Sequence, residues 1–298
     1  MNDLAVDFKG VGKKYPFFTL DNIDLQVPEG TIMGLIGPNG AGKSTTIRIL
    51  MGLVHQEQGE VRVLGHRMPA DQVAAKWDIG FASEDMRLYD VMTLEWHMNF
   101  IRSMYPKWDA AYAQVLLKRF GLRAEQKIKG LSHGQRVKAT LLLVLARRPK
   151  LVVLDEPTTG LDPVARHEIL RELTAVMGDD GRSILFSSHN TQDVEQISDQ
   201  ITFIDRGRII ESMDKETYLE RWRRLRLEVP SGWTLPNLPG IVDVRREGRL
   251  AVATANAFAP GLANAYESSG ARVQSIETMT LEEIFVANVE LSRQEVGA

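Results

Sequence analysis

Residues 37–45 of the chain, Gly37-Pro38-Asn39-Gly40-Ala41-Gly42-Lys43-Ser44-Thr45, decide the fold that we expect. They match the phosphate-loop pattern G-x-x-x-x-G-K-[ST]. The apolar run before them, TIMGLI at 31–36, predicts a buried parallel strand, and TTIRILMGL at 45–53 predicts a helix. A glycine turn without a ligand is the alternative, but strand, loop and helix come in the order that the motif requires. We therefore predict that this loop binds a nucleoside triphosphate.

The residue types of the loop suit phosphate chemistry. Glycines let consecutive backbone N–H groups turn toward phosphate oxygens, and the N-terminus of the following helix adds partial positive charge. We expect Lys43 to reach the β- and γ-phosphates. We expect Ser44 to place its hydroxyl on the magnesium ion that bridges these phosphates.

Composition excludes several classes of protein. The 298 residues carry 36 basic and 39 acidic side chains, a net charge of -3, so nothing favours a general nucleic-acid binder. Cysteine is absent, which excludes disulfides, thiolate metal sites and a cysteine nucleophile. The N-terminus does not have the basic-then-apolar order of a signal peptide, and the densest apolar run, 139–146, is too short to span a membrane. We expect a cytoplasmic protein.

The order of apolar segments predicts an α/β fold. Short β-type runs alternate with turns up to about residue 65. Residues 86–150 predict a helical subdomain, with helices at 93–104, 109–120 and 135–147. Buried strands at 151–154 and 183–187 flank a helix at 163–177. This alternation is typical of an open parallel sheet with helices on its faces.

The chain is long enough for two domains. After residue 210 the pattern changes to short strands at 224–229, 241–246 and 250–255, with helices near 260–269 and 281–291. We expect a nucleotide-binding domain over 1–215 and a small α+β domain over 216–298. A basic cluster at 221–226 (RWRRLR) is too short to favour a lipid or nucleic-acid patch, and we expect a solvated connector there.

Two adjacent carboxylates, Asp155 and Glu156, follow the apolar run 151–154. Ligands of α/β proteins bind at the carboxyl edge of the sheet, so this position places both acids near the phosphate loop. Asp155 is suited to hold magnesium, and Glu156 is suited to polarise an attacking water molecule. An acidic turn without a ligand is the alternative.

A further motif carries a family resemblance. Leu131-Ser132-His133-Gly134-Gln135 lies before the 151–154 strand and resembles the LSGGQ signature of ATP-binding cassette (ABC) ATPases. In the same family, Tyr15 resembles the aromatic residue that stacks on adenine, Gly160-Leu161-Asp162 resembles the loop after the acidic pair, and His189 resembles the switch histidine. The resemblance covers residues 4–210. It implies a phosphate-loop NTPase of ABC ATPase type, with a mixed sheet core, an antiparallel β subdomain and a helical subdomain.

The resemblance assigns roles residue by residue. It implies ATP and Mg²⁺ as cofactors, and catalysis by Glu156, His189 and Lys43. The implied ATP-binding residues are Tyr15, Gly37, Pro38, Asn39, Gly40, Ala41, Gly42, Lys43, Ser44, Thr45, Ser132, Gly134, Gln135 and Asp162. The implied magnesium ligands are Ser44, Glu84 and Asp155. Ser132 and Gln135 also fit a helix capping box, which is compatible with a helix N-terminus that binds a γ-phosphate from another subunit.

Two residues depart from the family pattern. The segment 78–84 aligns with a loop that usually ends in glutamine, and here it ends in Glu84. A carboxylate can coordinate magnesium but adds negative charge beside a triphosphate, and a surface acid without a ligand role is the alternative. His133 replaces the first glycine of the signature, which is expected to alter the approach of the backbone to phosphate.

The resemblance also implies partners. In the family, two copies of the fold close head-to-tail around two ATP molecules, so a chain with one set of motifs is expected to form a homodimer or a heterodimer with a similar subunit. Separate integral membrane permease subunits are the other implied partners, contacted through the helical subdomain and the Glu84 loop at the inner face of the cell membrane. MTLEEIF at 279–285 resembles a C-terminal segment of bacterial type-2 exporter ATPases. We therefore expect export, with import left open.

Two other functions compete with this interpretation. One is a soluble ABC ATPase that acts on ribosomes or nucleic acid. Such proteins typically carry two cassettes, coiled coils or zinc modules, which this sequence does not have, and we expect no nucleic-acid partner. The other is a regulatory subunit that binds nucleotide without turnover, which is disfavoured because Lys43, Asp155, Glu156 and His189 are all present.

Overall fold

The computed structural model describes residues 3–297, with the side chains of all of them except 178–180 and 292–297. The chain folds into two compact units, Met1–Ser212 and Met213–Ala298. The sequence predicts the start of the second domain at residue 216, which lies one residue into helix α8 (Lys215–Arg221).

A six-stranded sheet, in the order β10-β9-β3-β8-β7-β6, forms the centre of the first unit. Its strands are β3 (Ile32–Ile36), β6 (Ile79–Ser83), β7 (Leu151–Asp155), β8 (Ser183–Ser188), β9 (Gln200–Asp205) and β10 (Arg208–Asp214). β3 pairs in parallel with β8 and β9, and β7 pairs in parallel with β6 and β8. Every residue of β3 and β7 is buried, which explains why these strands read as apolar runs without alternation.

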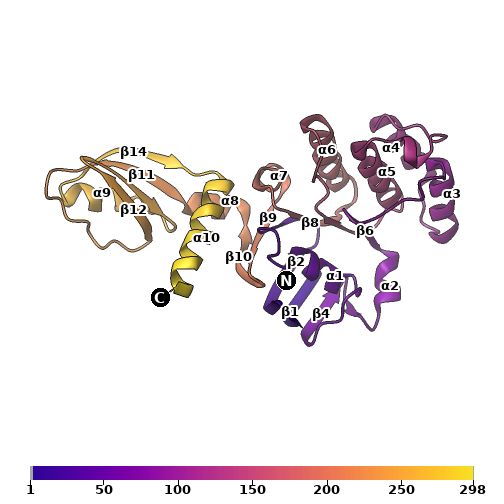
Figure 1. The fold of residues 1–298 in the computed structure, drawn as a ribbon, viewed down its shortest axis with the longest axis horizontal. Helices are drawn as coiled ribbons and strands as arrows, with labels where there is room; N and C mark the ends of the chain where they lie inside the picture. Colours follow the sequence, from indigo (N-terminus) through magenta and orange to yellow (C-terminus); the bar gives the residue numbers. More distant parts are fainter. Residues whose placement is uncertain (1–2, 298) are drawn as a thin grey trace. The chain divides into compact units, whose positions relative to one another are not determined.

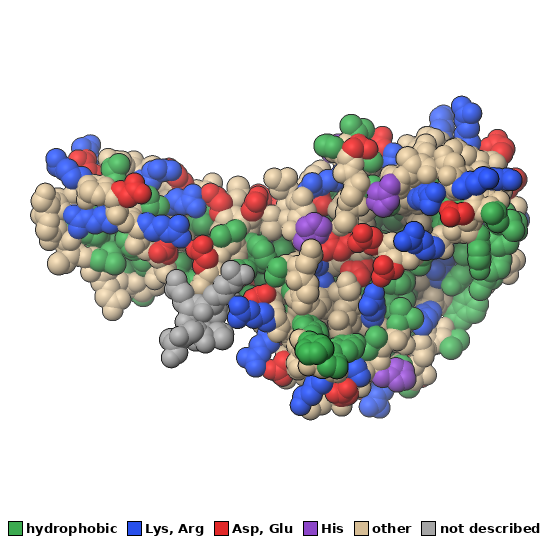
Figure 2. Space-filling model, in the orientation of Figure 1, with side chains coloured by type: hydrophobic (Ala, Val, Ile, Leu, Met, Phe, Trp, Pro, Cys, Tyr) green, Lys and Arg blue, Asp and Glu red, His purple; other side chains and the backbone are tan. Residues whose placement is uncertain are grey.

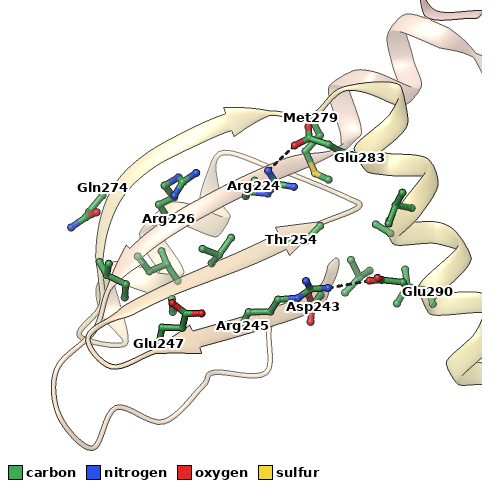
Figure 3. A pocket seen from close by; sticks show the side chains of 18 of the residues that line it. Arg224, Arg226, Asp243, Arg245, Glu247, Thr254, Gln274, Met279, Glu283 and Glu290 are labelled. Carbon is green, nitrogen blue, oxygen red and sulfur yellow. Dashed lines mark hydrogen bonds and ion pairs between the residues drawn. The ribbon is translucent and has the colours of Figure 1, made fainter. Parts of the chain in front are cut away.

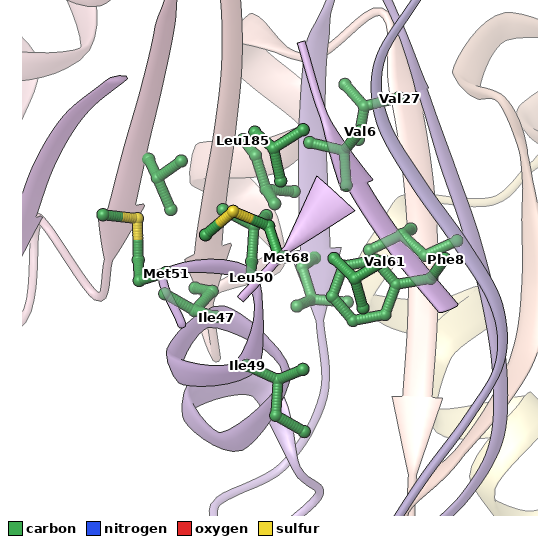
Figure 4. Packing of buried hydrophobic residues seen from close by; sticks show 14 of the residues in the cluster. Val6, Phe8, Val27, Ile47, Ile49, Leu50, Met51, Val61, Met68 and Leu185 are labelled. Atoms are coloured by element: carbon green, nitrogen blue, oxygen red, sulfur yellow. The ribbon is translucent and has the colours of Figure 1, made fainter. Parts of the chain in front are cut away.

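A second sheet, in the order β2-β1-β4-β5, belongs to the same unit. Its strands, β1 (Leu4–Tyr15), β2 (Phe18–Pro28), β4 (Gln58–Val63) and β5 (His66–Met68), pair antiparallel. Helix α1 (Lys43–Leu50) packs against both sheets, because Ile47 and Leu50 share one buried cluster with Val61 of β4 and Leu185 of β8 (Figure 4). The helix predicted at 45–53 thus begins at Lys43, and its packing fixes the phosphate loop that precedes it.

Three helices, α3 (Leu94–Met104), α4 (Ala110–Arg119) and α5 (His133–Leu145), lie together within the stretch 86–150 (Figure 1). A short 3-10 turn, η1 (Ile128–Gly130), precedes α5. Each of the three helices begins at a side-chain cap, which satisfies a free backbone N–H of the first turn. The capping residues are Thr93, Asp109 and Ser132, and Ser132 forms the capping box that the sequence predicts.

Arg147 attaches this group of helices to the sheet. Its Nη2 donates hydrogen bonds to the carbonyl oxygens of Lys76, at the end of α2 (Gln72–Trp77), and Ile79, at the start of β6. The guanidinium carbon also lies 3.5 Å from the ring centre of Tyr105, in a cation–π contact. The Arg147 side chain therefore connects the end of α5 with the end of α3 and with the edge strand β6.

Two further helices complete the first unit. They are α6 (Pro163–Asp180), which the sequence predicts, and α7 (Thr191–Ile197), which sequence reasoning missed. α7 packs very closely on β3, since a Cβ atom at Gly34 would lie 2.3 Å from Val194 Cγ1 and 2.8 Å from Ser198 Oγ. Among the residues that the structure describes, no helix is both long and apolar enough to cross a membrane.

The second unit is an antiparallel sheet with the strand order β12-β13-β11-β14. Its elements are α8, β11 (Arg223–Glu228), β12 (Ile241–Glu247), β13 (Leu250–Ala255), α9 (Gly261–Ser268), β14 (Arg272–Thr278) and α10 (Leu281–Gly297). Leu225, Leu227 and Ala253 pack on one face with Tyr266 of α9. The opposite face and α10 enclose a hollow of about 730 Å³, in which arginines are paired with carboxylates (Figure 3).

The basic cluster at 221–226 is not the solvated connector that its composition predicts. Trp222 is buried, and the residues after it form the strand β11, which lies between two neighbours in the sheet. Arg224 and Arg226 pair with Glu283 and Glu277, so their charges are balanced within this unit. The prediction failed because an alternation of arginine and leucine also fits a strand with one buried face.

We predict that Gly34→Ala destabilises the first unit by about 1–3 kcal/mol, because the new methyl group would overpack the contact between β3 and α7. Urea unfolding, monitored through amide exchange of residues 32–36, measures the decrease in the free energy of unfolding. Gly130→Ala is the control, since its Cβ would meet its nearest atom, Gln126 Nε2, at 3.7 Å. Val194→Ala should restore part of the stability of Gly34→Ala. Unfolding of Gly34→Ala at the same urea concentration as the wild type would contradict the prediction.

Candidate nucleotide site

The parallel register brings four segments to one edge of the central sheet. Ile36 of β3 pairs with Ser188 of β8, and Asp155 of β7 pairs with Ser187 of β8 and Ser83 of β6. The residues that follow these strands must therefore lie close together. They are the phosphate loop, His189, Glu156 and Glu84.

A cleft of about 680 Å³ lies at this edge. It opens between the phosphate loop, the turn between β1 and β2, and the segments after β6, β7 and β8. Its lining residues are Phe17, Phe18, Asn39, Gly40, Ala41, Gly42, Lys43, Ser44, Thr45, Glu84, Glu156, Thr159 and His189.

The glycines of the loop are required by its shape. Gly40 and Gly42 have φ angles of 81° and 115°, a region that residues with a Cβ atom rarely adopt. A Cβ atom at Gly37 would lie 2.3 Å from the carbonyl oxygen of Ile204. Lys43 folds back over the loop, and its Nζ donates to the Gly37 carbonyl at 2.7 Å. The backbone of the loop is thus accessible to a ligand, and the loop holds the positively charged Lys43 side chain in the cleft.

Asp155 and Ser44 lie together, as the sequence predicts. Asp155 Oδ1 accepts hydrogen bonds from Ser187 Oγ at 2.6 Å and from Ser44 Oγ at 3.1 Å. Glu84 is adjacent, because its backbone N–H donates to the Asp155 carbonyl at 3.2 Å and its side chain lines the cleft. A hydroxyl and a carboxylate oxygen are ligands that suit Mg²⁺, which usually takes one or two carboxylates and substrate phosphates. Among the described residues, no group of three or more acidic, histidine or cysteine side chains is placed to hold a metal ion by itself.

Glu156 is held on several sides. Its backbone N–H donates to Ser187 Oγ at 2.9 Å, with a φ angle of 54° in the left-handed region. Its Oε1 lies 3.1 Å from Lys43 Nζ. Its Oε2 accepts from His189 Nδ1 at 2.8 Å and from Thr159 Oγ1 at 3.0 Å. Burial opposes ionisation of this carboxyl, but the pKa of Glu156 is lowered overall because Lys43 and His189 stabilise the charged form.

The predicted aromatic residue Tyr15 is not among the residues that line the cleft. It lies at the end of β1, 40% exposed, with its ring centre 6.4 Å from that of Phe18. The cleft is lined instead by Phe18 and by the fully exposed Phe17, which sequence reasoning missed. A stretch of three aromatic residues around one proline at 15–18 was the available signal.

The remaining predicted residues lie outside the cleft. Ser132 and Gln135 exchange capping hydrogen bonds at the start of α5, and Gly134 lies between them. Asp162 caps α6 by accepting from the N–H groups of Val164 and Ala165, and these bonds lower its pKa. The structure thus separates the predicted ATP-binding residues into two groups on one chain.

Comparison with known proteins identifies the family. A sequence model described as ABC transporter matches residues 20–159, which contain the phosphate loop, the signature and the Asp155-Glu156 pair. The ABC transporter ATP-binding protein YtrB of Bacillus subtilis (strain 168) is 30% identical over 208 residues, 70% of this chain and 71% of that protein. The chain belongs to the ABC transporter family.

Similarity to a further relative and to a solved structure supports that assignment. The Nod factor export ATP-binding protein I of Burkholderia orbicola (strain AU 1054) is 32% identical over 217 residues, 70% of this chain and 71% of that protein. A solved structure described as the ATP binding subunit of an ABC transporter has a TM-score of 0.66 and 26% identity, over 72% of this chain and 92% of that one. The chain is thus an ABC transporter ATPase, and the predicted fold class is confirmed.

The lowered pKa of Glu156 predicts a pH-dependent contribution to stability. Because the folded value lies below the ordinary 4.5, the ionised carboxylate stabilises the folded chain at pH 7, and this contribution is lost as the pH falls below about 4.5. Glu156→Gln should be less stable by about 1–2 kcal/mol at pH 7, and the difference should shrink at pH 4. Urea midpoints of both proteins at both pH values measure it, with the exposed Glu125→Gln as control. An equal difference at pH 7 and pH 4 would refute the ionic origin.

Proposed function

We propose that this ABC transporter ATPase binds ATP and Mg²⁺ in the cleft at the carboxyl edge of the central sheet and hydrolyses the γ-phosphate there. The observation that carries the proposal is the convergence of Lys43, Ser44, Glu156 and His189 from three separate segments on one cleft. Because positioning and charge stabilisation account for most of the catalysis of phosphoryl transfer, a site of this kind needs these groups in fixed places.

Each side chain has a distinct proposed role. Backbone N–H groups of the loop and Lys43 bind the phosphates. Ser44 and Asp155, with Glu84 beside them, would hold Mg²⁺, which would supply positive charge to the phosphates. Glu156 accepts a hydrogen bond from the attacking water and polarises it. His189, 2.8 Å from that carboxylate, fixes its orientation and is proposed to contact the γ-phosphate.

The adenine base is proposed to stack at the turn between β1 and β2. Tyr15 has the position in the sequence that the family uses for this contact, and its ring is partly exposed. Phe17 extends from the same turn and lines the cleft, so it offers a second aromatic face. Both rings are available for the apolar and stacking contacts that purines make with aromatic side chains.

The signature residues are proposed to serve a second subunit. Ser132 and Gly134 stand at the exposed N-terminus of α5, away from the cleft that holds Lys43. A helix N-terminus with free N–H groups is suited to a phosphate, but this chain's own phosphate loop lies elsewhere. A head-to-tail dimer would bring the γ-phosphate of the other subunit to Ser132. The active unit is therefore a homodimer, or a heterodimer with a similar subunit.

An exposed aromatic patch is the proposed contact with a membrane permease subunit. It consists of Tyr89, Trp96 and Phe100, whose rings lie in successive contact at 5.7 Å and 5.2 Å between centres. Figure 2 shows hydrophobic side chains gathered over α3. Beneath the patch the buried His97 donates from Nδ1 to the Thr93 carbonyl and accepts at Nε2 from the Tyr89 N–H. A rigid apolar patch of this kind fits a protein partner.

The proposed transport direction is export. It rests on the Nod factor export protein among the relatives and on the MTLEEIF segment at 279–285. The proposed location is the cytoplasmic face of the cell membrane, where ATP and the permease subunits are both available.

Glu156→Gln tests the proposed hydrolysis. We predict a loss of at least about 100-fold in kcat, the contribution of a general base, with ATP binding retained because the phosphate loop is unchanged. Phosphate release and equilibrium ATP binding measure the two effects, with Glu125→Gln as the matched control. Equal phosphate release by wild type and Glu156→Gln would remove Glu156 from the mechanism.

Trp96→Ala tests the proposed permease contact. We predict that membrane subunits no longer co-purify with this variant from detergent-solubilised membranes of the native host, while its ATP affinity is unchanged. Val115→Ala, at an exposed position on α4, is the control for the same group of helices. Co-purification of ribosomes or DNA with the wild type, and of no membrane protein, would replace the transporter proposal with the soluble ATPase.

A further inference from the structure

His133 makes a contact that a glycine at this signature position could not make. It is the first residue of α5, and its Nε2 lies 3.1 Å from the carbonyl oxygen of Thr159. A carbonyl oxygen only accepts, so Nε2 carries the proton and donates it. The contact joins the signature turn to the loop that follows the Asp155-Glu156 pair.

The loop has the shape that this contact requires. Gly160 has a φ angle of 71°, and a Cβ atom there would lie 3.3 Å from His133 Nε2. The first turn of α5 also packs closely on α6, since a Cβ atom at Gly134 would lie 3.3 Å from the Cβ of Ala165. The start of α5 and the loop after Glu156 are therefore packed closely, with the imidazole between them.

The same loop residue contacts the catalytic carboxylate. Thr159 Oγ1 donates to Glu156 Oε2 at 3.0 Å, and the Thr159 N–H donates to the Glu156 carbonyl at 3.3 Å. Glu156 Oε2 also accepts from His189 Nδ1 at 2.8 Å. A continuous line of hydrogen bonds thus runs from His189 through Glu156 and Thr159 to His133.

We propose that His133 is a positioning residue that couples the ATP cleft of its own subunit to the signature turn. The proposal rests on the proposed dimer, in which that turn meets the ATP of the other subunit. A displacement of Glu156 when its cleft engages ATP moves Thr159, and His133 carries the displacement to the first turn of α5. The geometry of this chain's own ATP cleft then affects how its signature turn binds the γ-phosphate of the ATP that the other subunit holds. All of these hydrogen bonds lie within one chain. The coupling is therefore expected in a homodimer and in a heterodimer alike.

His133→Ala removes the link without touching the phosphate loop or the acids. We expect kcat to fall about five-fold, the size of one hydrogen bond, and the Hill coefficient for ATP to fall toward 1, while the affinity for the first ATP molecule is unchanged because the phosphate loop is intact. His133→Gln should restore both kinetic values, because its amide nitrogen can donate to the same carbonyl. His55→Ala, at an exposed position, is the matched control. A wild-type Hill coefficient of 1, or wild-type kinetics in His133→Ala, would overturn the proposal.

Thr159→Val provides a second test through a double-mutant cycle. The substitution keeps the shape of the side chain and removes its hydrogen bond to Glu156. If His133 acts through Thr159, the double variant should lose little more than either single variant, because both changes break the same line. Multiplicative losses would show that the two residues act independently and would overturn the proposal.

Amide exchange separates this inference from the proposed function. If the wild type releases no phosphate, the proposed hydrolysis fails, and the inference is then decided by exchange in the isolated proteins. We expect residues 156–162 and 131–135 to exchange faster in both His133→Ala and Thr159→Val than in the wild type and in His55→Ala. Wild-type protection of residues 156–162 in His133→Ala would overturn the inference even where hydrolysis by the wild type is normal.

Discussion

The parallel pairing of β3, β8, β7 and β6 is the constraint on which the rest of the site depends. Because the pairing is in register, Ser187 meets Asp155 and the four strand ends deliver their following residues to the same edge. A slip of one residue would move a strand by about 3.3 Å and turn its side chains to the opposite face. Ser187 would then lose Asp155, and Asp155 would lose Ser44. The buried apolar side chains of β3 and β7 oppose such a slip, so hydrophobic packing far from the cleft fixes its polar geometry.

Lys43 adds an electrostatic constraint to this geometry. The same nitrogen contacts the Gly37 carbonyl and the Glu156 carboxylate, so the cation suited to phosphate is already aligned with the base suited to water. Asp155 and Glu84 bring further negative charge to the same edge. The Mg²⁺ proposed for this cleft would offset the negative charge of these acids beside a triphosphate.

The sequence predicts the positions of the phosphate loop and of the acidic pair better than it predicts the elements around them. The phosphate loop and the Asp155-Glu156 pair are local patterns next to apolar runs, and the chemistry of each motif is carried by a few consecutive residues. Helix α7 was missed because its residues 191–197 (TQDVEQI) are short and mostly polar. Strand β14 was missed for a similar reason, since the stretch 272–278 (RVQSIET) has few apolar residues. In both elements tertiary packing stabilises a helix or strand for which the local sequence has only a weak propensity.

The role of Ser187 could not be predicted, because it depends on which strand lies next to β7. The contact between His133 and Thr159 depends in the same way on how α5 packs against a loop distant in the sequence. The basic cluster at 221–226 led to a structural error, since its buried Trp222 and paired arginines belong to a sheet. Charge patterns identify exposed residues poorly when each charge has a partner that is distant in the sequence.

The left-handed backbone of Glu156 has a consequence for the evolution and engineering of this protein. A non-glycine residue with a φ angle of 54° costs on the order of 1 kcal/mol or more, and glycine or asparagine adopts that conformation more readily. The ion pair with Lys43 and the hydrogen bonds from His189 and Thr159 offset this cost, so the side chain and its backbone conformation depend on each other. Glycine or asparagine at this position would relieve the backbone but lose those contacts, so engineering for heat resistance gains little by replacing the residue that is proposed to polarise water.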